Sequence, residues 1–240
     1  MAKINKDLHN MKSHREKLKI FLLYFFLIAG GLWHILGLFQ NLTKLLASPL
    51  LIVLGFWLIV ENWRLLKFEP IHSTHNSNIL HRFLGWIMVV LLLTLLIESL
   101  GVKTGKIFGN YDYGTSLSPF IGNVPLAIGF AWISMLLSSI PIAQWIGSLV
   151  QVKNYLFFTF FASLMMTLFD FFMEPAVMKL NYWTWHDGKI PFQNYLAWFI
   201  ISFILLSMGQ QLKIFSRKLS TVGIHAYFAQ LIYFLLVNLK

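Results

Sequence analysis

The chain has no cysteine and only nine acidic residues among its 240 positions. The missing thiols exclude cysteine nucleophiles, cysteine-ligated zinc and disulfide bonds. Charged residues make up 12% of the sequence, whereas soluble domains carry about 25%. Hydrophobic residues reach 58%, so the composition excludes a soluble globular enzyme and a disordered chain. It indicates an integral membrane protein.

Seven apolar segments are long enough to predict transmembrane helices, which need about 20 residues each. They cover residues 20–39, 46–66, 80–100, 120–140, 154–175, 194–213 and 220–239. Gly122, Pro125 and Gly129 interrupt the fourth segment, and residues 141–152 are expected to form an interfacial turn of helix. No repeat or linker separates two domains. We therefore expect a basic tail over residues 1–19 and a single all-α transmembrane domain over residues 20–240.

The basic residues outnumber the acidic ones by 19 to nine. In a membrane protein this excess indicates orientation rather than a nucleic-acid partner, because cytoplasmic segments collect Lys and Arg. With the N-terminus inside, 13 of the 19 basic residues lie on the cytoplasmic side, Lys153, Arg217 and Lys218 among them. The sequence predicts a multi-pass protein of the inner (plasma) membrane with its N-terminus inside and its C-terminus outside.

Three acids lie inside the apolar segments, near the predicted outer ends of the third helix (Glu98) and the fifth helix (Asp170 and Glu174). The i,i+4 spacing of the last two puts both carboxyls on one helix face, about 6 Å apart at Cβ. Two carboxyls this close in a low dielectric do not both ionise readily, so one is expected to keep the proton that a general acid needs. Intramembrane acids mark functional sites, with a structural polar contact or a cation site as the alternatives. Glu61, by contrast, is expected to pair with Arg64 three residues later.

Two connections at the same predicted end are rich in aromatic residues. The first covers about 19 residues, 101–119, without a clear helix or strand, and connections of that length are commonly functional. The four aromatic side chains of interest are Tyr111, Tyr113, Trp183 and Trp185. Such residues are typical of an interfacial belt or of a site that stabilises positive charge. His34, in the outer half of the first helix, is a further candidate contact.

Alternating helix directions bring these acids and aromatic connections to one face of the membrane. This layout predicts an active site with acids at moderate depth under aromatic loops, open to lipid and suited to a lipophilic substrate. The motifs HExxH and HxxxH are absent from the expected spans, so no metal site is expected.

Two blocks of residues resemble the membrane carotenoid-biosynthesis family, which includes γ-carotene and lycopene 1,2-hydratases and bisanhydrobacterioruberin hydratases. The first block is Glu98, Gly101, Thr104-Gly105, Phe108-Gly109, Tyr111, Tyr113, Ser118-Pro119, Gly122, Val124-Pro125 and Trp132. The second is Asp170, Glu174-Pro175, Trp183, Trp185, Gly188, Pro191, Asn194 and Trp198. The chain departs from the family pattern at Glu174, where the family has Asp, and at Ala197, where it often has Gly.

The resemblance implies a helical membrane enzyme that adds water across the terminal C=C of an acyclic carotenoid end group, giving a tertiary alcohol without a cofactor. Asp170 or Glu174 would protonate the alkene, and Glu98 would orient or deprotonate the attacking water. The residues expected to contact the substrate are Tyr111, Tyr113, Trp183, Trp185, His34, Asn194 and Trp132. The expected partners are a carotenoid, the bilayer and other enzymes of the same pathway.

Three other functions share some of these features. A carotenoid or isoprenoid cyclase also begins by protonating an alkene, and only the access of water to the cation distinguishes it. A prenyltransferase needs acidic clusters for Mg²⁺ and diphosphate, for which one DxxxE pair is thin support. A proton-coupled transporter would spread its acids through the membrane depth.

Overall fold

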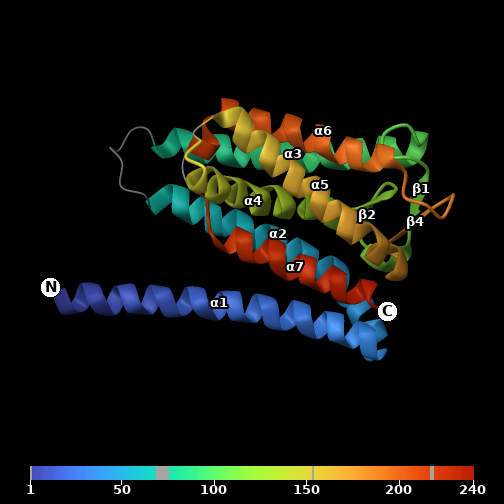
Figure 1. Cartoon of the computed structure of the whole chain (residues 1–240), viewed down its shortest axis with the longest axis horizontal. Coiled ribbons are helices and arrows are strands. Elements are labelled where there is room, and N and C mark those ends of the chain that lie inside the picture. Colours follow the sequence, from blue (N-terminus) through green and yellow to red (C-terminus); the bar gives the residue numbers. More distant parts are fainter. Residues whose placement is uncertain (1, 69–75, 153, 217–218) are drawn as a thin grey trace.

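The computed structural model describes residues 2–68, 76–152, 154–216 and 219–240. Lys153, Arg217 and Lys218 of the charge count lie outside these ranges. The described chain forms seven α-helices: α1 (Ala2–Leu36), α2 (Gln40–Phe68), α3 (Asn76–Thr104), α4 (Leu126–Leu149), α5 (Tyr155–Lys179), α6 (Phe192–Gln211) and α7 (Val222–Asn238). They lie roughly along one direction, with the two chain ends at opposite ends of the bundle (Figure 1).

Six of these helices are long and apolar enough to cross a membrane, and α7 is shorter, at 17 residues. A span needs about 17–25 residues, so α7 sits at the lower limit of that range. The predicted all-α, polytopic membrane bundle is confirmed. The basic tail is helical and continues directly into the first span, because α1 begins at Ala2.

The fourth predicted helix was placed too early in the chain. Residues 120–125 form two short strands, β2 (Phe120–Ile121) and β3 (Val124–Pro125), which pair in an antiparallel hairpin. Gly122 adopts a φ of +62° in its turn, a conformation that suits glycine, and α4 starts only after Pro125. The predicted interfacial turn over 141–152 was also wrong, since α4 continues through Pro141 to Leu149.

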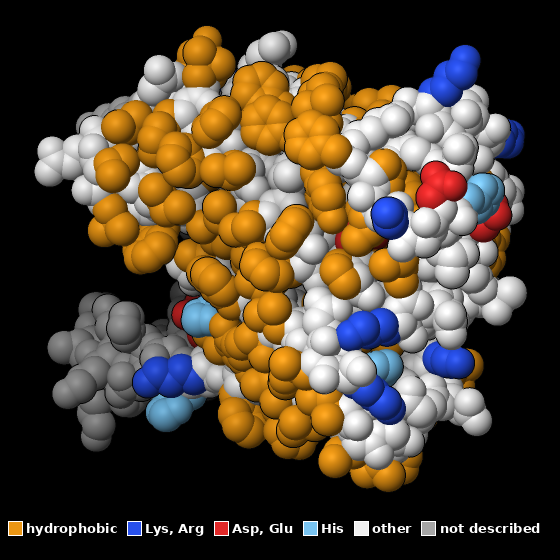
Figure 2. All heavy atoms as spheres, turned by 45° about the vertical axis from the view of Figure 1, so that its right-hand side comes forward, with side chains coloured by type: hydrophobic (Ala, Val, Ile, Leu, Met, Phe, Trp, Pro, Cys, Tyr) orange, Lys and Arg blue, Asp and Glu red, His pale blue; other side chains and the backbone are white. Residues whose placement is uncertain are grey.

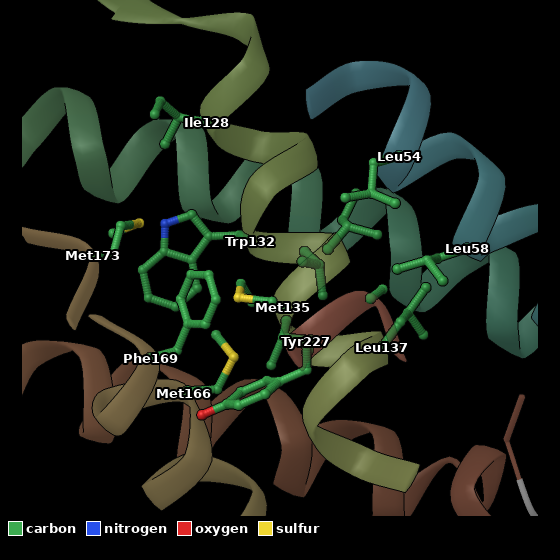
Figure 3. Close-up of a cluster of buried hydrophobic side chains, with 14 of the residues drawn as sticks. Leu54, Leu58, Ile128, Trp132, Met135, Leu137, Met166, Phe169, Met173 and Tyr227 are labelled. Carbon is green, nitrogen blue, oxygen red and sulfur yellow. The ribbon is translucent and has the colours of Figure 1, made fainter. Parts of the chain in front are cut away.

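Helix α4 forms the centre of the bundle. In its apolar window 83% of the residues are buried, against 17% to 39% in the other five long spans. Figure 3 shows the packing around it, with Trp132 and Met135 of α4 close to Phe169 and Met166 of α5 and to Tyr227 of α7. A helix covered on nearly all sides is apolar all round, as the sequence of α4 is.

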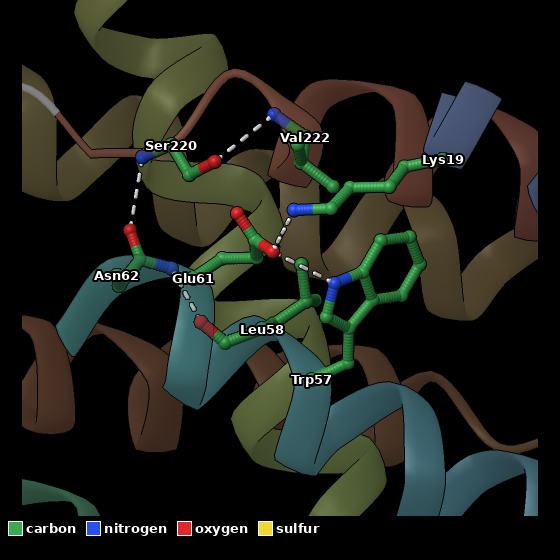
Figure 4. A network of polar contacts seen from close by, with 7 residues as sticks. All are labelled: Lys19, Trp57, Leu58, Glu61, Asn62, Ser220 and Val222. Atoms are coloured by element: carbon green, nitrogen blue, oxygen red, sulfur yellow. Dashed lines mark hydrogen bonds and ion pairs between the residues drawn. The ribbon is translucent and has the colours of Figure 1, made fainter. Parts of the chain in front are cut away.

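A polar network ties α1, α2 and the start of α7 together (Figure 4). Glu61 of α2 binds Lys19 of α1 and accepts a hydrogen bond from Trp57 at 3.0 Å. The predicted pair of Glu61 with Arg64 was therefore wrong, because a lysine on a neighbouring helix takes the place of the arginine one turn away. Asn62 accepts the backbone N–H of Ser220 at 2.9 Å, which fixes the entry into α7.

Candidate active site

Two three-residue strands close one end of the bundle. Strand β1 (Tyr111–Tyr113) comes from the connection between α3 and α4, and β4 (Trp183–Trp185) from the one between α5 and α6. They pair antiparallel, with Tyr111 opposite Trp185 and Tyr113 opposite Trp183. The first connection thus contains a strand, contrary to expectation. The local sequence did not predict this strand because its partner lies about 70 residues further along the chain.

The period of two in a β-strand sends these four aromatic rings to the same face. The intervening Asp112 and Thr184 are exposed on the other face, while Tyr111, Trp183 and Trp185 are buried. The ring centroids of Tyr111 and Trp185 lie 5.1 Å apart. We call β1 and β4 together the aromatic ribbon, and it presents its rings toward the helix bundle.

Under the ribbon, Glu98 of α3 accepts three hydrogen bonds. Tyr111 and Tyr113 donate their hydroxyls to Oε2 at 2.6 and 2.9 Å, and Trp132 of α4 donates its indole N–H to Oε1 at 2.9 Å. Only 5% of the Glu98 surface is exposed. Both of its oxygens are therefore held by strong donors, which is the environment of an oriented carboxylate.

Asp170 and Glu174 of α5 form a pair of carboxyls near Glu98. Trp183 and Trp185 donate to Oε2 of Glu174 at 3.1 and 2.8 Å. The side-chain amide of Asn194 on α6 donates to both acids, to Asp170 at 2.7 Å and to Glu174 at 3.2 Å. The second oxygen of Asp170 is buried without a hydrogen-bond partner.

A cavity of about 60 Å³ lies between these groups. Its lining includes Glu98, Glu174, Asn194 and ten aromatic side chains, among them Tyr111, Tyr113, Trp132, Trp183, Trp185 and Trp198. No Lys, Arg or His side chain of the described chain lines it. An acidic, aromatic chamber of this kind is suited to a positively charged reaction centre.

Trp198 has no predicted role, yet its ring stacks on Trp132 with centroids 4.1 Å apart and an interplanar angle of 15°. It lies one helical turn after Asn194 on α6, and this i,i+4 spacing is the signal that could have found it.

Two of the predicted site residues do not line the cavity. Asp170 is completely buried and is linked to Glu174 by the side-chain amide of Asn194. His34 lies in a separate cavity of about 90 Å³ with Lys44 and Lys179, so the structure does not bring it to the acids. The remaining eight predicted residues line the cavity together.

The two tyrosines of the ribbon act as hydrogen-bond donors over a wide pH range. Burial, and then the negative charge of Glu98, raise the pKa of Tyr111 and Tyr113 above the ordinary value of 10.0. Both hydroxyls keep their protons and continue to hold Glu98 at physiological pH.

The family model of carotenoid biosynthesis proteins matches residues 50–239. The chain belongs to this family. The match includes every residue that lines the cavity and leaves out all of α1, with His34.

A curated relative of the family is the bisanhydrobacterioruberin hydratase of Haloarcula japonica. The two are 24% identical over 121 residues, which make up 47% of this chain and 41% of the relative. This chain therefore spans less than half the length of that relative. No solved structure matches this chain.

Proposed function

We propose that this carotenoid-biosynthesis protein hydrates the terminal C=C of an acyclic carotenoid in the plasma membrane. The observation that carries the proposal is the meeting of two acidic centres, Glu98 and Glu174, across one aromatic cavity. In the reaction a carboxyl proton adds to the less substituted carbon of the terminal C=C, the π bond breaks and a tertiary carbocation forms at the other carbon. Water then forms a C–O bond to the cation and loses a proton to Glu98. Transfer of this proton from Glu98 to Glu174 within the cavity restores the starting state, and no electrons are gained or lost.

Glu174 is the proposed proton donor, because it lines the cavity and has one weakly held oxygen. Its Oε2 accepts two indole N–H groups, whereas Oε1 has only the 3.2 Å contact with Asn194. A proton on Oε1 is free to point at the substrate. Asp170 acts as a positioning residue, linked to Glu174 by the shared amide of Asn194.

Glu98 is the proposed water-orienting group and base. Its three donors hold both oxygens in place, so the carboxylate does not need to reorganise when it accepts a proton from water. The faces of the surrounding Tyr and Trp rings stabilise the cation between protonation and attack.

Two features favour hydration over the alternatives. A transporter would distribute its acids along the membrane, whereas Glu98, Asp170 and Glu174 gather at one end of the bundle. The acidic cavity, at about 60 Å³, is larger than the roughly 10–15 Å³ that one water molecule needs, which supports the access of water to the site. A cyclase needs the opposite, the exclusion of water.

The test is expression of the chain in cells that accumulate an acyclic carotenoid such as lycopene, with mass spectrometry of the pigments. A product heavier by one water supports the proposal. An isomer of unchanged mass would identify a cyclase, and unchanged pigments with both lycopene and γ-carotene would contradict hydration of this substrate class.

The variants E174Q and E98Q are expected to lose the product, since each removes a proton-transferring group while keeping the side-chain shape. D112N is the matched control, because Asp112 lies on the exposed face of the ribbon, 2.8 Å from His186 and away from the cavity. Normal hydration by E174Q would overturn the assignment of the proton donor.

A further inference from the structure

A second cavity, of about 320 Å³, runs between α1, α2 and α7 on the same half of the bundle. Its lining extends from Phe26 to Trp33 on α1, from Leu42 to Leu54 on α2 and from Gln230 to Phe234 on α7, and includes Tyr182. None of the lining side chains is charged. We call this cavity the α1–α2–α7 groove.

The groove lies directly beside the acidic cavity. Four side chains line both spaces: Leu51, Tyr182, Gln230 and Phe234. These residues form the partition between a long apolar groove and the chamber that holds Glu98 and Glu174. The acidic cavity has a volume of about 60 Å³ and the groove is about five times larger. A long substrate must therefore leave most of its length outside the acidic cavity.

The groove also opens toward lipid. On α2, Leu42, Leu46 and Leu50 are 41%, 36% and 52% exposed, although they line it. In Figure 2 hydrophobic side chains cover much of the middle of the molecular face, while charged ones lie toward the end with the aromatic ribbon and, in smaller number, toward the opposite end. A lipophilic molecule can therefore enter sideways from the bilayer.

The length of the groove suits a linear chain. It follows α2 from Leu42 to Leu54, which at about 1.5 Å per residue corresponds to about 18 Å. A polyene of forty carbons is about as long as the hydrocarbon core, roughly 30 Å. The groove thus accommodates more than half of it.

We propose that the α1–α2–α7 groove binds the polyene chain of the substrate and leads its end group past Leu51 and Phe234 to Glu174. The inference rests on the proposed function for the identity of the ligand, and it adds the binding site and entry route of the chain. It also assigns α1, which lies entirely outside the family match, as one wall of the binding site.

The test fills the groove without changing the acids. L46W and L50W place a large ring in the groove at half-exposed positions, where the fold tolerates it. L45W is the matched control, because Leu45 is 72% exposed on the same helix and does not line the groove. Each variant is purified from polyene-producing cells, and both the hydrated product and the polyene retained by the protein are measured.

We expect L46W and L50W to retain and convert about tenfold less forty-carbon polyene than L45W or the unmodified chain. A ten-carbon alkene with the same end group should be converted equally by all four proteins, since it fits without the groove. Equal retention and conversion by L46W, L50W and L45W would overturn the groove. So would an acyl lipid retained in place of polyene.

The two proposals fail in different ways. If the unmodified chain retains polyene but adds no water, hydration fails, and the loss of retention in L46W and L50W still supports the groove. If it hydrates polyene and the tryptophan variants do so equally, the groove fails alone. An unmodified chain that neither retains nor converts polyene contradicts both.

Discussion

Tyr111 and Trp185 face each other in the aromatic ribbon and donate to different acids, Tyr111 to Glu98 at 2.6 Å and Trp185 to Glu174 at 2.8 Å. The pairing of two short strands therefore sets the relative positions of two carboxyls on separate helices. The geometry of the site depends on the register of the ribbon, which suggests where distant substitutions should act.

Gly114 is one such position. Its N–H donates to the carbonyl of Tyr182 at 2.8 Å, and a Cβ there would lie 2.2 Å from the carbonyl oxygen of Asn181. We expect G114A to shift the ribbon and lower hydration by about tenfold to a hundredfold, because small displacements of oriented groups are costly. G85A is the control, since nothing lies within 4 Å of a Cβ at Gly85. Equal activity of the two variants would argue against control by the ribbon.

Asn194 holds Asp170 and Glu174 with one amide. We expect N194A to lower kcat by about tenfold or more with a smaller change in KM, because the proton donor loses its orientation while the aromatic pocket remains. Two buried acceptors also lose a partner, which costs about 1–3 kcal/mol of stability. N123A removes an amide at the same end of the bundle, where Asn123 binds Ser99, and should leave kcat unchanged. A pure KM effect in N194A would be evidence against the positioning role.

The pH dependence of stability should reflect the ribbon tyrosines. Their pKa is raised by burial, so above pH 10.0 the unfolded chain loses protons that the folded chain keeps. The contribution of the two tyrosines to the free energy of unfolding is therefore complete below pH 10.0 and is lost as the pH rises above that value. Thermal denaturation across the alkaline range measures this loss, and Y111F should reduce its slope. A slope that Y111F leaves unchanged would assign the alkaline loss to other groups.

The contact of Glu61 with Lys19 is expected to hold α1 on the bundle. E61Q removes the charge and should lower the stability by about 1 kcal/mol, as for a partly exposed ion pair. Thermal unfolding in detergent measures the change, and E16Q is the control because Glu16 is exposed. Should E61Q match E16Q, the pair contributes nothing to the docking of α1.

The spans and the acids could be predicted because they depend on local sequence. Long apolar runs specify transmembrane helices, and a carboxyl inside such a run needs donors wherever it lies. The pattern Y-x-Y and W-x-W has the period of a strand, but three residues do not reveal a partner 70 positions away. The pairing of Tyr111 with Trp185 thus follows from the tertiary fold.

His34 shows that the depth of a residue in the membrane does not predict whether it reaches the site. Its level in the membrane was predicted to be that of the site, and the family resemblance gave no position for α1. A helix at the edge of the bundle can turn any face inward, and α1 packs mainly on α7. Its histidine therefore meets Lys44 and Lys179 instead of the carboxyls.

Every donor that holds a carboxyl in the site comes later in the chain than the carboxyl itself. Glu98 precedes Tyr111, Tyr113 and Trp132, while Glu174 precedes Trp183, Trp185 and Asn194. During synthesis each acid therefore enters the membrane before its partners exist, which is unfavourable for a carboxyl within an apolar span. The long apolar runs around these acids offset that cost, so the apolar sequence of α3 and α5 serves insertion as well as packing.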